Sequence, residues 1–287
     1  MDIEKREYVL SQSLAYHNGA ARTIDIRGDK LISGSIDRRV NYFLRNPTTL
    51  KFDIEKEFTF FTDYIFSVRI IDDTRFAVGC KDKNIYICQF DNTTGPIATL
   101  LGHTGPVNSL ETVDSMILSG SWDTTAKLWS IETGNCLATL EGHAYAVTVF
   151  FTSGKFIITG SQDGSLHLWD ITGKRLKTVT KAHENIVRGI TEIQGIGILT
   201  CSNDSKVKLW SLDLDELSMF EDHTSFVFAL ANIRTDSLDF ASGGEDFKLM
   251  VYASGKKVQE MAHPNTIWSV VVDRNHDNDL ITACGDG

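Results

Sequence analysis

Short apolar runs alternate with turn-forming residues along the whole chain. Stretches rich in Val, Ile, Leu, Phe and Trp are interrupted by Gly, Asn, Asp or Ser. The interruptions fall about every eight to twelve residues, which is the spacing of short β-strands joined by tight turns. The pattern therefore predicts an all-β protein.

One segment of this pattern is repeated. The segments GSWDTTAKLW, GSQDGSLHLW and CSNDSKVKLW occupy residues 120–129, 160–169 and 201–210. Aspartates recur at the same position of the repeat, 40 to 45 residues apart: Asp37, Asp82, Asp123, Asp163, Asp204, Asp246 and Asp286. This period resembles that of WD40 propeller blades, each made of about four strands. We therefore expect residues 1–287 to form one domain, a seven-bladed WD40 β-propeller.

Three repeats carry a histidine, a serine or threonine, an aspartate and a tryptophan at matching positions. The sets are His103, Ser119, Asp123, Trp129; His143, Thr159, Asp163, Trp169; and His183, Thr200, Asp204, Trp210. The WD40 resemblance implies that each set forms a chain of hydrogen bonds that stabilises its blade. A Ser-His-Asp hydrolase site is the alternative, but such a site is normally built once, beside a cleft. We therefore predict no catalytic residue and no enzyme.

Other repeats depart from this pattern. Phe61 stands at the histidine position, and Phe43, Cys88 and Tyr252 stand at the tryptophan position. These blades are expected to depend more on packing. The polar segment 46–57 is expected to be the longest connecting loop.

The two ends of the chain are predicted to meet in the last blade. Residues 8–17 match residues 136–143, so residues 8–14 are expected to be its outer strand. That blade begins at His263 and its third strand is missing after Asp286. We expect the sequence to be the front part of a longer protein.

Charge and cysteine content limit the classes of partner and the compartment that we expect. The net charge of −10 disfavours a nucleic-acid partner. The five cysteines include no CxxC pair, which favours a reducing compartment and argues against a zinc or disulfide framework. No apolar stretch approaches the roughly 20 residues of a membrane span. We expect a protein of the cytoplasm, and also of the nucleus, with no cofactor, metal or membrane partner.

Exposed aromatic and arginine side chains indicate a binding surface. Three positions per repeat are expected to face the top of the propeller: those on each side of the first buried residue of the inner strand, and that before the turn aspartate. They include Arg22, Tyr64, Phe66, Trp122, Arg188, Phe226, Phe228 and Trp268. Such residues are enriched at the centres of protein interfaces. The alternative is that some of these rings lean into the channel as core.

The sequences of several segments are more specific than the general WD40 pattern. YVLSQSL, GSWDTTAKLW, HENIVRG, SNDSKVKLW, HTSFVFAL, GGED and IWSV resemble the propeller of the phospholipase A2-activating protein family. That resemblance implies a propeller that docks mono- or polyubiquitin, in a cofactor of the AAA-type segregase called valosin-containing protein. It also implies a central ubiquitin-binding module and a C-terminal segregase-binding module, neither of which is in this sequence.

These observations predict a non-catalytic ubiquitin receptor in ubiquitin homeostasis and proteasomal degradation. The hydrophobic patch of ubiquitin would dock on the aromatic top face, and Arg22 and Arg188 would donate hydrogen bonds at the channel mouth. The main alternative is a generic WD40 interaction scaffold with a different partner. An enzyme and a nucleic-acid reader are less favoured.

Overall fold

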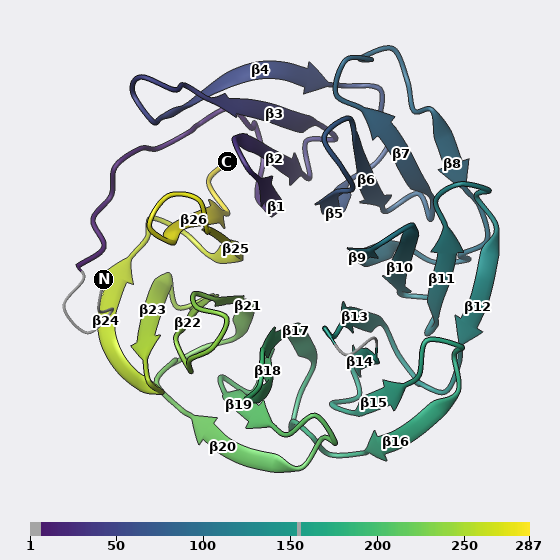
Figure 1. The fold of residues 1–287 in the computed structure, drawn as a ribbon, viewed down its shortest axis with the longest axis vertical. Coiled ribbons are helices and arrows are strands. Elements are labelled where there is room, and N and C mark those ends of the chain that lie inside the picture. The colour runs from purple at the N-terminus through teal and green to yellow at the C-terminus, as the bar shows by residue number, and fades with distance from the viewer. Residues whose placement is uncertain (1–6, 154–155) are drawn as a thin grey trace.

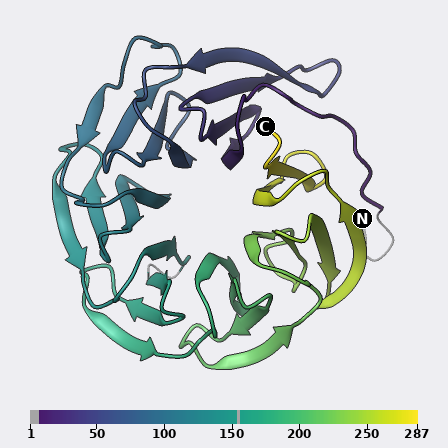
Figure 2. The same cartoon turned by 180° about the vertical axis from the view of Figure 1, so that it is seen from behind.

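A ring of antiparallel sheets surrounds a central channel. The computed structural model describes residues 7–153 and 156–287, which form 26 strands in six four-stranded sheets and one two-stranded sheet (Figure 1). Within each sheet, consecutive strands run from the channel to the rim, as the view from behind also shows (Figure 2). The all-β propeller predicted from the sequence is confirmed.

The first three sheets cover less than half of the chain. They comprise β1 (Ala21–Arg27), β2 (Lys30–Ser35), β3 (Val40–Arg45) and β4 (Phe52–Phe58); β5 (Ile65–Ile70), β6 (Arg75–Cys80), β7 (Ile85–Gln89) and β8 (Ala98–Leu100); and β9 (Val107–Val113), β10 (Met116–Ser121), β11 (Ala126–Ser130) and β12 (Cys136–Leu140).

The remaining sheets complete the ring. They comprise β13 (Val147–Phe151), β14 (Ile157–Ser161), β15 (Leu166–Trp169) and β16 (Arg175–Val179); β17 (Val187–Ile193), β18 (Gly197–Ser202), β19 (Val207–Trp210) and β20 (Glu216–Phe220); β21 (Val227–Asn232), β22 (Phe240–Gly244), β23 (Lys248–Ala253) and β24 (Lys256–Ala262); and the pair β25 (Ile267–Asp273) and β26 (Asp279–Cys284).

The position of a strand in its sheet explains its composition. The second strand β18, with the sequence GILTCS, is buried throughout because neighbouring sheets pack against both of its faces. The outer strand β20, with the sequence ELSMF, is exposed at every position but the last. Most of the apolar core therefore lies in the inner three strands of each sheet.

Glycines in the second strands allow adjacent sheets to approach closely. A Cβ atom on Gly160 would lie 2.6 Å from Cγ1 of Val187, and one on Gly34 would lie 2.6 Å from Cγ2 of Ile65. Val187 and Ile65 are the first residues of the inner strands of the next sheets. Each of these contacts therefore sets the spacing between neighbouring blades.

The outer strand predicted at residues 8–14 is not formed. The backbone of Tyr8 instead exchanges hydrogen bonds of 2.8 and 2.7 Å with the side chain of Gln259, on β24. The side chain of Gln12 exchanges bonds of 2.7 and 2.9 Å with the backbone of Phe52, on β4. This segment runs along the rim from β24 to β4 (Figures 1 and 2). It has no strand to pair with because the sheet behind it consists of β25 and β26 alone.

The loop predicted at residues 46–57 is also wrong in part. Residues 46–51 connect two strands, but Phe52–Phe58 is the outer strand β4. Its sequence FDIEKEF is polar because alternate side chains face solvent, while both terminal phenylalanines are buried. Polarity alone thus made this strand look like a loop.

Candidate functional site

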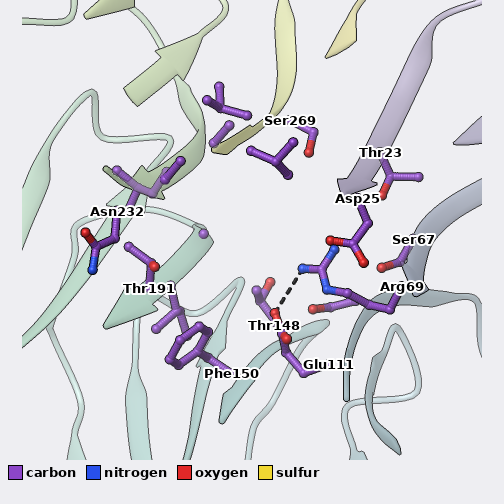
Figure 3. Close-up of a pocket in the computed structure, with 18 of the residues that line it drawn as sticks. Thr23, Asp25, Ser67, Arg69, Glu111, Thr148, Phe150, Thr191, Asn232 and Ser269 are labelled. Carbon is purple, nitrogen blue, oxygen red and sulfur yellow. Dashed lines mark hydrogen bonds and ion pairs between the residues drawn. The ribbon is translucent and has the colours of Figure 1, made fainter. Parts of the chain in front are cut away.

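The channel contains a cavity of about 580 Å³ lined by the inner strands (Figure 3). The second residue of every inner strand is among the residues that line this cavity. These residues are Arg22, Phe66, Asn108, Thr148, Arg188, Phe228 and Trp268. The channel therefore collects the side chains predicted to follow the first buried residue of each inner strand.

A β-bulge presents most of these side chains. In the pair β1 and β2, Ala21 faces Ser35 and Thr23 faces Gly34, so Arg22 is left out of the ladder. The same irregularity leaves out the second residue of β5, β9, β17, β21 and β25, whereas β13 pairs regularly. A bulge inserts an extra residue and re-aims its side chain. The bulges therefore explain how successive residues can pack in the core and line the channel.

Four channel residues form a continuous stack. Cζ of Arg22 lies 3.5 Å from the centre of the Trp268 ring, and the Trp268 and Phe228 rings stack at 4.4 Å. Cζ of Arg188 lies 5.4 Å from the centre of the Phe228 ring. Cations over aromatic faces are attracted by the ring quadrupole. The predicted residues Arg22, Arg188, Phe228 and Trp268 are thus brought together.

The other predicted aromatic residues lie further out. Trp122, Tyr64 and Phe226 are 54%, 39% and 37% exposed. Phe66 stacks on Trp122 at 5.8 Å, and Nζ of Lys81 lies 4.4 Å from the Tyr64 ring centre. The predicted set is therefore divided. Five of its members line the channel. For the three aromatic residues among these five, this is the alternative in which the rings lean into the channel. The other three members are exposed rings outside it.

Below the mouth, charged side chains face one another inside the channel. Arg69 Nη2 donates to Glu111 Oε1 at 2.9 Å, and Figure 3 shows the Asp25 carboxylate beside the same guanidinium. Burial raises the pKa of Asp25 to about 6, although Arg69 and a 2.7 Å hydrogen bond from the Ile70 N–H oppose the rise. Sequence reasoning missed this group because its members come from three different repeats.

The hydrogen-bond chain predicted for the third sheet is present in the structure. Nδ1 of His103 lies 2.7 Å from Oδ2 of Asp123, and Nε2 lies 2.7 Å from Oγ of Ser119. Trp129 Nε1–H donates to the same hydroxyl at 2.8 Å. Burial alone would raise the pKa of Asp123, but hydrogen bonds from His103, Thr104 and Thr125 hold it below its ordinary range.

The fifth sheet repeats this arrangement. His183 Nδ1 lies 2.8 Å from Oδ2 of Asp204, and its Nε2 lies 2.7 Å from Oγ1 of Thr200. Trp210 Nε1–H donates to Thr200 at 2.8 Å. The third and fifth sheets thus each contain a buried chain of hydrogen bonds that runs from tryptophan through a hydroxyl and a histidine to an aspartate carboxylate.

The fourth sheet departs from the expected geometry. His143 Nδ1 lies 3.0 Å from the Ser165 hydroxyl and 3.9 Å from Asp163, so the predicted direct hydrogen bond is absent. Its Nε2 lies 2.7 Å from Oγ1 of Thr159, which accepts from Trp169 Nε1–H at 2.9 Å. Ser165 replaces the carboxylate because its hydroxyl lies closer to the imidazole than Asp163 does.

Two further chains of this kind escaped prediction. His17 contacts Asp37 at 3.0 Å and Ser33 at 2.7 Å. In the sixth sheet, His223 contacts Asp246 at 2.9 Å and Ser242 at 2.8 Å. Asp37 and Asp246 were already among the aspartates that recur at the same position of the repeat. A search for a histidine about twenty residues before each aspartate would have found both chains.

The second sheet shows how packing replaces the histidine. Phe61 lies at the histidine position and its ring contacts Tyr86 edge to face at 5.6 Å. The Tyr86 hydroxyl donates to Oδ2 of Asp82 at 2.5 Å. A tyrosine from the third strand therefore satisfies the turn aspartate that histidine satisfies elsewhere.

Neither a metal site nor a membrane span is found in the described part of the chain. Residues 7–153 and 156–287 place no three His, Cys, Asp or Glu side chains together as metal ligands would be. They also include no helix with the length and apolar character needed to cross a bilayer.

The chain is similar to known repeats and propellers. The family model of the WD domain, G-beta repeat, matches residues 94–130, 134–170 and 173–211. The crystal structure of the WD40 beta propeller domain of Doa1 superposes with a TM-score of 0.87 and 29% identity, covering 98% of this chain and 94% of that one. The chain is therefore a WD40 β-propeller.

Two curated relatives define the family. Ubiquitin homeostasis protein lub1 of Schizosaccharomyces pombe is 45% identical over 73% of this chain and 28% of its own length. Protein DOA1 of Saccharomyces cerevisiae is 38% identical over 53% of this chain and 22% of its own length. The match thus spans about a quarter of each relative. The chain is homologous to both and belongs with them to the phospholipase A2-activating protein family.

Proposed function

We propose that this chain is a non-catalytic ubiquitin-binding propeller that acts in ubiquitin homeostasis and ubiquitin-dependent degradation. The observation that carries the proposal is the exposure of Trp122, Tyr64 and Phe226 outside the channel mouth. Trp122 stacks on Phe66, and Phe226 contacts Phe228 edge to face, so two of these rings extend the aromatic lining of the channel to the surface. Exposed aromatic surface of this kind is typical of a partner-binding site. The name of the relative, ubiquitin homeostasis protein lub1, supports ubiquitin as that partner.

The proposed mechanism is shallow docking. The hydrophobic patch of ubiquitin would cover the three exposed rings, while Phe66, Phe228 and Trp268 support them from the channel. Arg22 and Arg188 would donate hydrogen bonds at the channel mouth. A single small interface of this kind is expected to have a Kd of order 10–100 μM, so tandem modules would supply avidity.

Several finer features belong to the same proposal. The two-stranded sheet of β25 and β26 would be the seventh blade. An AAA-type segregase would be bound by modules of the longer relatives that this chain does not match. We place the protein in the cytoplasm and also in the nucleus, without a cofactor, nucleic-acid or membrane partner.

The decisive experiment is a titration of ¹⁵N-labelled ubiquitin with this chain, followed by NMR. Shifts should centre on the hydrophobic patch of ubiquitin and should be weaker with Trp122→Ala. The matched control is Leu137→Ala, because Leu137 is 55% exposed but lies on the outer strand β12. Phe228→Ala, checked for folding, tests the supporting ring.

Two results would overturn the proposal. One is the absence of ubiquitin shifts at millimolar protein, and the other is an equal loss with Trp122→Ala and Leu137→Ala. The first would favour a WD40 scaffold with a different partner.

A further inference from the structure

The two arginines at the channel mouth differ in their partners. Arg188 Nε–H donates to Oδ1 of Asn203 at 2.8 Å. Arg22 packs its guanidinium over Trp268, but it forms no hydrogen bond or ion pair with any residue that the structure describes. Guanidinium carries five N–H donors. An arginine held in this way presents most of its donors to the channel.

The other charged residues that line the cavity have partners. Arg69 is paired with Glu111, and Asp25 accepts from the Ile70 N–H. Arg274 donates to the carbonyl groups of Asn232 and Ile233, and Glu192 accepts from Ser153. Among the described charged residues of this cavity, Arg22 is thus the one without a polar partner.

The positive charge of Arg22 is not offset by a neighbouring carboxylate. Burial, together with repulsion from Arg188, lowers its pKa to about 10. Trp268, on which it rests, also has a buried Nε1–H with no partner among the described residues. Partly buried charges and donors of this kind are costly unless a ligand satisfies them. In the described part of the chain, the mouth around Arg22 and Trp268 therefore carries unpaired donors and positive charge, whereas the unpaired buried acceptor of the lining there, Oδ1 of Asn108, belongs to a different sheet.

We propose that Arg22 and Trp268, with Arg188 beside them, form a binding site for a peptide carboxylate. The planar fork of arginine matches a planar carboxylate through two parallel hydrogen bonds. Deeper in the same cavity the carboxyl groups of Asp25, Glu111 and Glu192 outnumber the two arginines, Arg69 and Arg274, and would repel an anion that moved past the mouth, a dianion most strongly. The carboxylate is thus held at the mouth, where the exposed rings can contact the peptide that carries it.

The site is tested with the whole chain and three short peptides of otherwise identical sequence. One ends in a free carboxylate, one ends in a carboxamide, and one has a terminal carboxamide and an internal aspartate. The readout is the indole N–H signal of Trp268 among the five tryptophans, assigned by its loss in Trp268→Phe. Inorganic phosphate is titrated as a fourth probe.

The free-carboxylate peptide should shift the Trp268 signal with a Kd of about 1–10 mM. The peptide that ends in a carboxamide and has no aspartate should not shift it. Arg22→Gln should weaken binding at least about tenfold, and Arg22→Lys less so, because lysine keeps the charge but loses the fork. The control Arg175→Gln should bind normally, since Arg175 lies over Trp169 and does not line the channel. Binding of the aspartate peptide would extend the site to side-chain carboxylates, and its absence would restrict the site to chain ends.

Equal shifts with carboxylate and carboxamide peptides would overturn the proposal. So would phosphate binding tighter than any carboxylate, or wild-type affinity in a folded Arg22→Gln protein. The proposal does not require ubiquitin to be the partner. Loss of the ubiquitin shifts with Trp122→Ala tests the docking surface, whereas the peptide titration tests this site alone.

Discussion

The imidazole rings of His143 and His167 stack with their centroids 3.8 Å apart and only 9° between their planes. Both nitrogens of His143 are hydrogen-bonded, to Ser165 and Thr159. Nδ1 of His167 is buried and has no partner among the described residues. Two protonated imidazoles in this position would repel each other, and burial disfavours a charge on either ring, so the folded protein favours the neutral pair.

Acid should therefore destabilise the propeller through this pair. Burial lowers the pKa of both His143 and His167 to about 4, reinforced for His143 by His167 and for both residues by Arg175. Because these pKa values are lower than in the unfolded chain, the pair favours folding above about pH 6.5, and that stability is lost as the pH falls towards 4.

Urea unfolding at pH 7 and pH 4.5 measures this effect. His167→Gln should reduce the loss of stability between the two pH values by about 1–2 kcal/mol, because one buried proton acceptor is gone. Identical pH dependence in the wild type and His167→Gln would show that the pair does not control acid stability.

Ser119 is predicted to be a key residue of the third sheet. Its hydroxyl accepts from Trp129 and contacts His103, so Ser119→Ala leaves two buried polar groups without their partner. We expect a loss of about 2–4 kcal/mol in the free energy of unfolding. The control Ser218→Ala removes an exposed hydroxyl on β20 and should change stability by less than about 0.5 kcal/mol. A loss in Ser119→Ala no larger than in the control would contradict this role.

The repeat period located the residues of these networks, and the WD40 resemblance implied the hydrogen bonds between them. Asp123 and Trp129 occupy fixed positions in the repeat because the blades pack in the same way and have nearly the same local sequence. The exchange of Asp163 for Ser165 beside His143 could not be predicted, because it depends on differences of about 1 Å in one turn.

The sequence also selected residues at the channel mouth without resolving the orientation of their side chains. A bulge at Arg22 or Trp268 shifts the pairing by one residue, and no sequence feature marks it. The rings of Phe228 and Trp268 therefore lie in the channel, while Trp122 and Phe226 are exposed. The strand expected at residues 8–14 failed for another reason, since a strand forms only where a partner strand is present.

Asp25 should destabilise the folded protein at neutral pH. Because burial raises the pKa of Asp25 to about 6, its ionised form is disfavoured, and stability falls as the pH rises from about 4 through 6. Asp25→Asn keeps an acceptor for the Ile70 N–H and should stabilise the protein by about 1–2 kcal/mol at pH 7, with little change at pH 4.

Glu111→Gln provides the contrast in the same channel. It removes the carboxylate that pairs with Arg69, so thermal unfolding at pH 7 should occur at a lower temperature than in the wild type. If Asp25→Asn also lowered the unfolding temperature at pH 7, the attraction between Asp25 and Arg69 would outweigh the burial of Asp25.

Gly160 is predicted to control the contact between two neighbouring sheets. Its missing side chain leaves room for Val187, and an added Cβ would lie 2.6 Å from one Val187 methyl group and 3.3 Å from Cδ1 of Ile190. Both neighbours are aliphatic side chains of β17, so relief requires movement of one sheet against the next. Overpacking of this kind costs about 1–3 kcal/mol, and Gly160→Ala should lower the free energy of unfolding by that amount.

Gly95→Ala is the matched control, because a Cβ there meets no atom within 4 Å. Paired chemical denaturation of the two variants and the wild type measures the difference. Double replacement with Val187→Ala should restore part of the loss in Gly160→Ala, since the 2.6 Å contact is then removed while the 2.9 Å contact with Cβ of residue 187 remains. If Gly160→Ala were as stable as Gly95→Ala, the spacing between these sheets would not depend on the glycine.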